Sequence, residues 1–157
     1  MKGTYTDLKM VTDRTAEDVA YALSLQEKGW EQLSEAQKKE WMAGLKGCLN
    51  AADLNRIEAA LTELSALLEE PPTWSQHVPS VPDKRYFKEL SENLARLRNH
   101  REYLYTGTPA LPTLPWNTWQ KLNAVERIFK DIHTIYWANQ LTGSYCGEIY
   151  AGEQGLL

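Results

Sequence analysis

The chain has few of the residues from which most catalytic and metal sites are built. It contains two cysteines and three histidines among 157 residues, and none has the His-x-x-x-His or Cys-x-x-Cys spacing of a zinc site. Two cysteines are too few for a disulfide framework, so we expect two reduced thiols. Neither a Gly-x-Ser-x-Gly turn nor a phosphate-binding glycine loop occurs. We therefore predict no enzyme, metal or cofactor; the loosest alternative is a nucleophile pair of Cys48 or Cys146 with His133.

Long apolar runs and excess positive charge are also absent. No stretch approaches the roughly 20 apolar residues of a membrane-spanning helix, and the first residues lack a signal-peptide core. The net charge of −4 gives no general attraction for nucleic acid. One expected helix carries a cluster of basic residues: Arg85, Lys88, Arg96, Arg98, His100 and Arg101. Because Glu89 and Glu92 dilute this cluster, we predict no nucleic acid binding. Because no long apolar run occurs, we predict no membrane span.

The chain is rich in aromatic residues that carry a polar group. It has six Trp and eight Tyr against two Phe, within a composition that is 43% hydrophobic and 24% charged. These percentages are typical of a soluble globular protein. Trp and Tyr suit half-buried positions and contact surfaces, so the simplest interpretation is a helical core with amphipathic edges.

A five-residue sequence motif occurs twice and predicts the fold class. Leu54-Asn55-Arg56-Ile57-Glu58 is repeated as Leu122-Asn123-Ala124-Val125-Glu126. Each copy begins a run of apolar residues at alternating three- and four-residue steps, which is the seam of an α-helix that packs on other helices. The two seams are Leu54, Ile57, Leu61, Leu64, Leu68 and Leu122, Val125, Phe129, Ile132, Tyr136. The sequence therefore predicts related helical units.

Capping patterns and prolines divide the chain into about five helices. Capping boxes begin the first helix at Thr15 and the second at Ser34, and Asn50 is the predicted N-cap of the third. The expected ranges are near 16–28, 35–46, 51–69, 82–104 and 117–138, with Asn117 or Thr118 capping the last. In the first two helices we expect Ala16, Val19, Leu23 and Trp41, Met42, Leu45 to form the apolar faces.

Two proline-rich connections and a glycine-rich tail complete the expected organisation. Residues 71–82 contain Trp74, so we expect a crossover that lies on the bundle and not a free linker. The fold class is an all-α, up-and-down-like bundle. It forms a single domain over residues 1–143, with related units near 15–70 and 83–138. Residues 144–157 have no helical period, and we expect them to form an extended C-terminal tail.

The Asn and Glu of the repeat lie three residues apart and share one helix face. One interpretation is a ligand site between Asn55, Glu58, Asn123 and Glu126. The other, which we prefer, is structural: each Asn positions a neighbouring loop, and each Glu favours the positive end of its helix.

Two stretches of the chain resemble a known helical module. One is Thr12 to Val19, and the other is Trp41-Met42-Ala43-Gly44-Leu45-Lys46-Gly47-Cys48-Leu49-Asn50-Ala51-Ala52-Asp53-Leu54-Asn55-Arg56-Ile57-Glu58. They resemble the module of tail-associated minor structural proteins in phages and prophages of Gram-positive bacteria. The Leu111-Pro112 and Leu114-Pro115 pairs, Asn123 to Ile128 and Gly147 to Glu153 are similar to its closing segments. Cys48-Leu49 departs from the small residue and Tyr usual there.

The resemblance implies a virion component without catalytic residues. The expected function is a structural or assembly role in a phage or prophage tail, with other virion proteins or a second copy as partners. The protein would be made in the bacterial host cytoplasm and located in the virion. The candidate contact residues are Trp74, Trp116, Tyr145, Ile149 and Tyr150. Alternatives are a module whose exposed Trp and Tyr bind cell-surface carbohydrate, and a small inhibitor of a hydrolase or nuclease.

Overall fold

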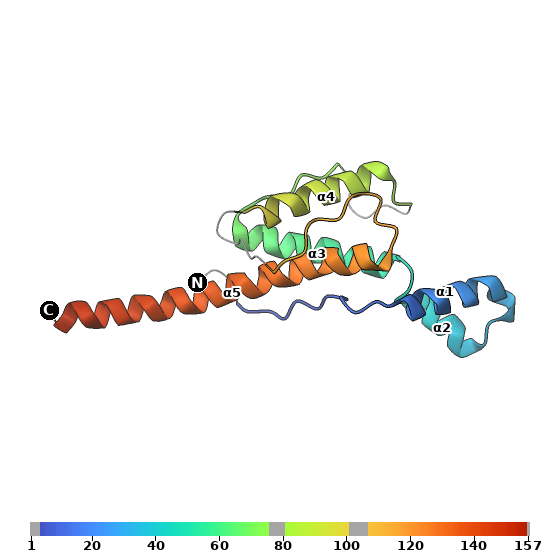
Figure 1. Cartoon of the computed structure of the whole chain (residues 1–157), viewed down its shortest axis with the longest axis horizontal. Coiled ribbons are helices and arrows are strands. Elements are labelled where there is room, and N and C mark those ends of the chain that lie inside the picture. The colour runs from blue at the N-terminus through green and yellow to red at the C-terminus, as the bar shows by residue number, and fades with distance from the viewer. Residues whose placement is uncertain (1–3, 76–80, 101–106, 157) are drawn as a thin grey trace.

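A computed structural model shows an all-helical protein (Figure 1). It describes residues 4–75, 81–100 and 107–156, with side chains described as far as residue 140. Within these ranges there are five α-helices, one short 3-10 helix and no strand. The helices are α1 (Ala16–Lys28), α2 (Glu35–Ala43), α3 (Ala51–Leu68), α4 (Lys84–Arg98) and α5 (Trp119–Leu156), with the 3-10 helix η1 at Trp30–Gln32. The predicted all-α fold class is confirmed.

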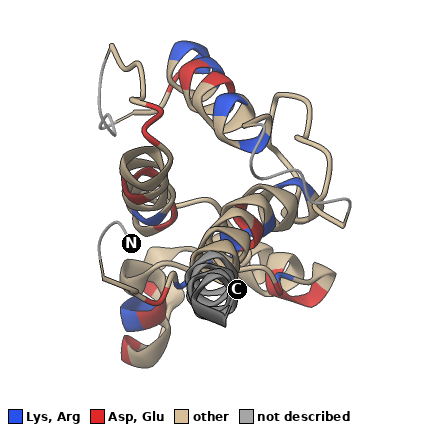
Figure 2. Cartoon of the chain, turned by 90° about the vertical axis from the view of Figure 1, so that its left-hand side faces the viewer, with Lys and Arg blue, Asp and Glu red and all other residues tan. Residues whose placement is uncertain are grey.

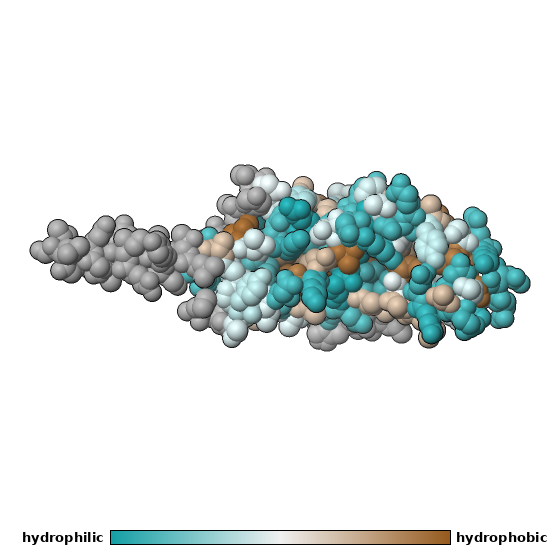
Figure 3. Space-filling view, turned by 90° about the horizontal axis from the view of Figure 1, so that it is seen from below, coloured by the Kyte–Doolittle hydropathy of each residue, from teal (hydrophilic) through white to brown (hydrophobic). Residues whose placement is uncertain are grey.

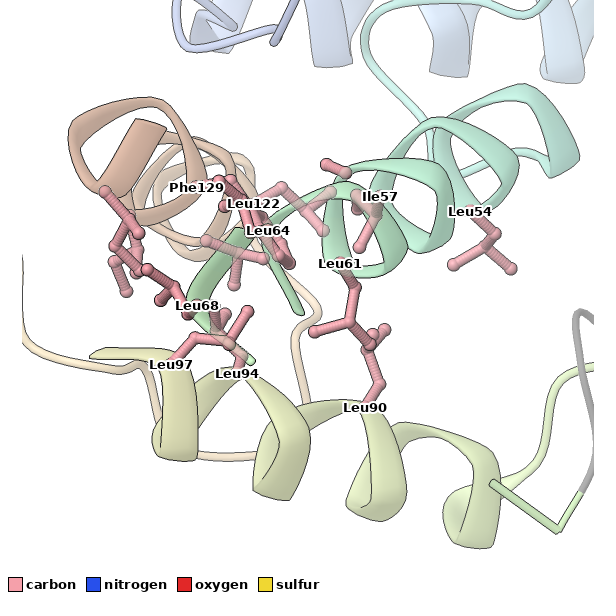
Figure 4. Close-up of a cluster of buried hydrophobic side chains, with 14 of the residues drawn as sticks. Leu54, Ile57, Leu61, Leu64, Leu68, Leu90, Leu94, Leu97, Leu122 and Phe129 are labelled. Carbon is pink, nitrogen blue, oxygen red and sulfur yellow. The ribbon is translucent and has the colours of Figure 1, made fainter. Parts of the chain in front are cut away.

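Helices α3, α4 and α5 pack together as a three-helix body. All ten residues of the two predicted seams are buried in its core. In Figure 4, Leu90, Leu94 and Leu97 of α4 point towards α3, where Leu61, Leu64 and Leu68 meet them. The regular three- and four-residue spacing puts these apolar side chains on one face of each helix, and burying that face is what stabilises the body.

The beginnings of the helices follow the predicted caps. Thr15, Ser34 and Asn50 each accept a hydrogen bond from the backbone N–H three residues later, and each belongs to a full capping box. Thr118 caps α5 by accepting from the N–H of Lys121 at 3.3 Å. A side-chain acceptor at this position satisfies one of the four helical N–H groups that lack a partner in the helix itself.

Helices α1 and α2 form a separate small unit, which we call the lobe (residues 15–48, with η1). Its buried apolar residues are Ala22, Leu25, Leu33 and Leu45, and this cluster is distinct from the core of the body. In Figure 1 the lobe lies at one end of the molecule, beyond the start of α3. Helix α3 therefore shares its core with α4 and α5, not with α1 and α2.

The apolar faces that we predicted for α1 and α2 were wrong except at Leu45, which is buried. Leu23 is 51% exposed and Met42 is 78% exposed, whereas Ala22 and Leu25 are buried. Helix α2 also ends at Ala43, before the expected stop at Gly47, because Gly44 leaves the helix at a φ of 99°. The physical reason is that the core of the lobe holds only four apolar side chains, none of them from α2 itself, so the other apolar side chains of the two short helices remain in solvent.

The first crossover lies on the body, as predicted from Trp74. The backbone N–H of Thr73 donates to the Asn93 amide oxygen at 2.9 Å, and the Asn93 amide nitrogen donates back to the Thr73 carbonyl at 3.0 Å. Further along, the Ser75 hydroxyl donates to Glu89 at 2.6 Å. These bonds attach the described part of the crossover to α4.

The C-terminal segment differs from the extended tail that we expected over residues 144–157. The backbone of α5 continues as a helix to Leu156 (Figure 1). The last proline of the chain is Pro115, so no residue after it lacks the N–H that a helix requires. Glycines such as Gly143 and Gly147 make a helix less stable but do not prevent it. We therefore replace the extended tail with a longer α5.

An extended segment at the N-terminus, which we call the strap (residues 4–14), runs along α5 before it enters α1 (Figure 1). The Tyr5 ring contacts His133 and Trp137 at ring-centre distances of 5.7 and 5.6 Å. Leu8 and Met10 pack partly buried against the core of the body. The strap thus connects the far end of the body to the lobe.

The buried seam makes a direct prediction. Leu61→Asp should lower the free energy of unfolding by at least about 4 kcal/mol, because an unpaired charge would enter a site that is 0% exposed. Glu35→Ala, on the exposed face of α2, is the control and should change stability by less than about 0.5 kcal/mol. Chemical denaturation measures both values. A Leu61→Asp variant that melts within a few degrees of the wild type would contradict the packing register.

Candidate functional site

The two tryptophans that we predicted as contact residues pack mainly against other residues of the protein itself. Trp116 is 5% exposed, its ring meets Phe87 edge-on, and its indole N–H donates to the Pro112 carbonyl at 3.0 Å. Trp74 is half-buried and stacks on Tyr86, with ring centres 5.7 Å apart. Trp116 therefore has almost no surface left for a partner, which corrects our expectation for this residue.

The other predicted contact residues, Tyr145, Ile149 and Tyr150, belong to the part of α5 whose side chains lie outside the described residues. Cys146 lies there too. The proposal that this segment attaches the protein to a neighbour stays a prediction.

Cys48 and His133 do not form the nucleophile pair that the sequence left open. Cys48 packs against the apolar cluster of the lobe, and burial raises the pKa of its thiol, which disfavours the reactive thiolate. His133 lies on α5 in the body, where its Nε2 is 3.7 Å from Glu63 and its ring meets Tyr5 and Trp137. Among the described residues, no group of three His, Cys, Asp or Glu could hold a metal ion.

The basic residues of α4 are balanced or used within the fold. Arg85 and Lys88 face Glu89 and Glu92 one turn later, at 3.4 and 3.9 Å. Arg98 donates to the Pro109 carbonyl at 2.9 Å and so holds the second proline-rich connection. In Figure 2, acidic and basic residues are interspersed along the helices, without a broad basic face in that view. Of the described helices, none has both the length and the apolar character to cross a membrane.

The repeated Asn and Glu do not converge on one ligand site. Glu58 lies 8% exposed and accepts a hydrogen bond from the Tyr86 hydroxyl at 3.1 Å, whereas Asn55 is exposed. In the second copy, Asn123 and Glu126 both contact the strap. The structural interpretation is therefore confirmed for Asn123, which does position a neighbouring segment. Both glutamates act as buried hydrogen-bond acceptors, a role that the sequence pattern did not predict.

Glu126 is the centre of a group of charges that we call the charge node (Arg14, Asp53, Arg56 and Glu126), of which all but Arg56 are buried. The Glu126 side chain is 0% exposed, and two arginines approach it from different segments. Arg14 of the strap lies 2.7 Å from Oε2, and Arg56 of α3 donates to Oε1 at 2.6 Å. The backbone N–H of Val11 adds a third donor at 3.3 Å. A buried carboxylate is tolerated only with such partners, since an unpaired one would be costly.

Asp53 and Asn123 complete the node on either side. Asp53 is 5% exposed, lies 3.1 Å from Arg14 and also pairs with Arg56 one turn later. Asn123 binds the main chain of Arg14 in both directions, accepting from its N–H at 3.1 Å and donating to its carbonyl at 2.9 Å. The node holds two positive and two negative side chains, so its charges balance, and its donors and acceptors are largely used by one another. Arg14 Nε is buried without a hydrogen-bond partner, and the rest of the arrangement fits a structural joint.

A close contact near the charge node brings together the two stretches that carry the family resemblance, Thr12 to Val19 and Trp41 to Glu58. A Cβ atom on Gly47 would lie 2.0 Å from the backbone oxygen of Asp18, so only glycine allows this approach. Lys46 Nζ lies 2.9 Å from Asp13 and 4.0 Å from Asp18. Arg14 and Lys46 had no role in our residue-by-residue reasoning, and Gly47 was predicted only as the end of the second helix. The signal was their presence in the two stretches of the family resemblance, which the fold brings together.

The lobe carries the main exposed aromatic surface of the described chain, which we call the lobe surface: Tyr21 (44% exposed), Leu23 (51%), Trp30 (46%), Trp41 (37%) and Met42 (78%). Large apolar side chains in this number are unusual on so small a unit, and Trp30 and Trp41 line one hollow together. In Figure 3, viewed from below, most of the surface is hydrophilic and the hydrophobic residues form small separate areas.

A shallow hollow lies within the lobe surface. It has a volume of about 180 Å³ and is lined by Leu25, Gln26, Trp30, Leu33 and Trp41. Lys38 Nζ lies 5.7 Å from the centre of the Trp30 ring, close enough for a cation–π contact. Two indole rings around an apolar floor can receive one side chain of a partner or the face of a sugar ring.

Comparison of the chain with protein-family models, with curated proteins and with solved structures found no match.

The node predicts a large difference between two glutamates. Glu126→Ala should lower the free energy of unfolding by about 3–5 kcal/mol, because it leaves Arg14 and Arg56 without their shared buried partner. Glu92→Ala is the matched control: it also removes a helical glutamate from an ion pair, but this pair with Lys88 is exposed and should contribute less than about 1 kcal/mol. Urea denaturation compares them. Similar losses for the two variants would show that the node is not a buried, coupled group.

Proposed function

We propose that the protein is a non-enzymatic structural or assembly component of a phage or prophage tail that acts through protein–protein contacts. The observation that carries this proposal is the lobe surface, where five large apolar side chains are exposed on one small unit. Aromatic side chains are the residues that most often anchor protein interfaces. Its partners would be other virion proteins or a second copy, and its location the virion, after synthesis in the host cytoplasm.

The role of the motif residues supports the same proposal. In the stretches that resemble the tail-protein module, Asn50, Asp53 and Arg56 cap or connect helices, and Gly47 permits close packing. In this chain those residues thus begin α3 and hold the segments on either side of the boundary between the lobe and the body. Such contacts are expected in a protein whose function is to present a binding surface, here the lobe surface, to a partner in a fixed position.

Location in the particle tests the proposal. When the phage or prophage that encodes this chain is induced, the protein should sediment with purified tails or complete virions. Deleting the gene should give incomplete or unstable tails under the electron microscope, because a contact between components would be missing. If purified tails and complete virions both lack the protein, and the particles look normal, a structural role is contradicted.

The contact surface has its own test. Trp30→Ala with Trp41→Ala should reduce incorporation into particles by at least about tenfold, since interface aromatics commonly contribute 2 kcal/mol or more each. The melting temperature should fall by no more than a few degrees because both rings are partly in solvent. Val81→Ala, which alters a 79% exposed apolar residue outside the lobe, is the control and should leave incorporation unchanged. Full incorporation of the double variant would exclude the lobe surface as the contact.

The hollow between the two tryptophans favours one alternative, a module that binds cell-surface carbohydrate. Aromatic faces beside the Gln26 amide would suit a sugar ring. Titration of purified cell-wall polysaccharide, followed by tryptophan fluorescence, separates the two functions. Saturable binding that is lost in the Trp30→Ala variant would support the alternative, whereas no binding leaves the assembly role.

The end of α5 is a second proposed attachment element, through Tyr145, Ile149 and Tyr150. A chain that ends at residue 143 should keep the thermal midpoint of the body, because the described core lies before this point. The same truncation should weaken self-association or incorporation. A lower thermal midpoint with normal incorporation would instead mean that the segment stabilises its own domain.

A further inference from the structure

The lobe has a second hollow, which we call the acidic pocket, and its chemistry differs from that of the hollow between the two tryptophans. It has a volume of about 330 Å³ and lies between the first half of α1 and the end of α2. Charged and aromatic side chains line it together with the backbone of residues 44–47. Its polar and glycine lining residues are Asp18, Tyr21, Glu40, Gly44, Lys46 and Gly47.

Two carboxylates line the acidic pocket from different helices. Glu40 of α2 accepts a hydrogen bond from the Tyr21 hydroxyl at 2.6 Å through Oε2. Asp18 of α1 accepts from the N–H and the hydroxyl of Thr15 at 2.9 and 3.1 Å through Oδ2. Within the described chain, Glu40 Oε1 and Asp18 Oδ1 have no hydrogen-bond donor, and Glu40 forms no ion pair. Each carboxylate therefore keeps one oxygen that can accept a hydrogen bond from a ligand.

The charges that line the acidic pocket do not balance. Lys46 is the one cation among the lining residues, and its Nζ lies 2.9 Å from Asp13 and 4.0 Å from Asp18. The hydrogen bond from Lys46 lowers the pKa of the Asp13 carboxyl, so Asp13 stays ionised and takes up most of the lysine charge. The negative charge of Asp18 and Glu40 is thus largely uncompensated.

The end of α2 adds to this negative potential. The carbonyl groups at the C-terminal end of a helix carry partial negative charge, which a basic residue in the last turn commonly offsets. Helix α1 has Lys28 in its last turn and α4 has Arg96 and Arg98, whereas α2 has none. A cation from a ligand would lie next to this end of α2, as the basic residues do in α1 and α4.

Tyr21 makes a guanidinium the cation that fits this pocket best. Its ring lines the pocket and is 44% exposed. The hydrogen bond to Glu40 raises the pKa of the Tyr21 hydroxyl, so the ring stays neutral at physiological pH. A guanidinium can stack on such a ring and donate to two carboxylates at once, whereas an ammonium is a compact, strongly hydrated point charge.

We propose that the acidic pocket binds an arginine side chain of the protein partner that the lobe surface contacts. Tyr21 belongs both to the pocket and to the lobe surface, so one partner can reach the two areas. This inference rests on the proposed function and adds the chemistry of the partner, an arginine beside its apolar contact residues. The arginine contributes selectivity more than affinity, because water and salt screen a pair in an open pocket.

A titration of the purified protein with N-acetyl-L-arginine amide tests the pocket. N-acetyl-L-citrulline amide is the matched probe, since it has nearly the same shape without the charge. Two-dimensional NMR should show saturable shifts of the Gly44 and Gly47 amides with the arginine probe, at a dissociation constant on the order of 1–10 mM. The citrulline probe should give no saturable shift. Equal effects of the two probes, or no saturation with either, would overturn the proposal.

Glu40→Gln locates the binding, because it removes the charge and keeps an acceptor for the Tyr21 hydroxyl. It should weaken arginine binding by about fivefold or more, with the spectrum of the body unchanged. Glu35→Gln is the matched control on the same helix: its side chain is 86% exposed and lies outside the pocket, so binding should change by less than about twofold. Binding that is equally strong in Glu40→Gln would overturn the assignment to this pocket.

Incorporation into particles separates this inference from the proposed function. Glu40→Gln should lower incorporation by about fivefold, and Glu35→Gln should leave it unchanged. If only the double tryptophan variant loses incorporation, the arginine contact is wrong while the proposed function stands. If the protein is absent from particles, the proposed function fails, and the arginine titration still decides whether the pocket binds this side chain.

Discussion

The structure depends on the burial of one carboxylate. Glu126 has no solvent exposure, and a charge in that position requires partners that other segments must supply. Arg56 brings α3 into register with α5, and Arg14 brings the end of the strap onto both helices. Asp53 then balances the second arginine and completes the capping box that begins α3. The course of the chain from the N-terminus to α1 follows from these requirements.

Apolar packing and charge pairing have different roles in this protein. The seams of α3, α4 and α5 supply the stability of the body through buried apolar area. The charge node contributes orientation, because paired charges allow few geometries even when their net energy is modest. The lobe has its own core of four buried apolar residues, and Asn50 at the start of α3 donates to the Leu45 and Cys48 carbonyls. This division leaves the aromatic lobe surface exposed at one end.

The features that the sequence predicted are those with a local cause. The seam from Leu54 to Leu68, the caps at Thr15 and Asn50 and the crossover at Trp74 follow from spacing or from neighbouring residues. The faces of α1 and α2 were missed because two short helices with more apolar residues than their core can hold give no unique period. The node was missed because Arg14 and Glu126 are distant in sequence, and no local pattern pairs them.

The central claim is that Arg14 and Glu126 act as one coupled pair that joins the strap to α5. A double-mutant cycle measures this directly, with urea unfolding of the wild type, Arg14→Gln, Glu126→Gln and the double variant. The structure predicts that the two substitutions are non-additive by about 1–3 kcal/mol, since each removes the same buried contact. Additive losses, with a coupling below about 0.5 kcal/mol, would show that the pair does not hold the strap on α5 and would contradict the account.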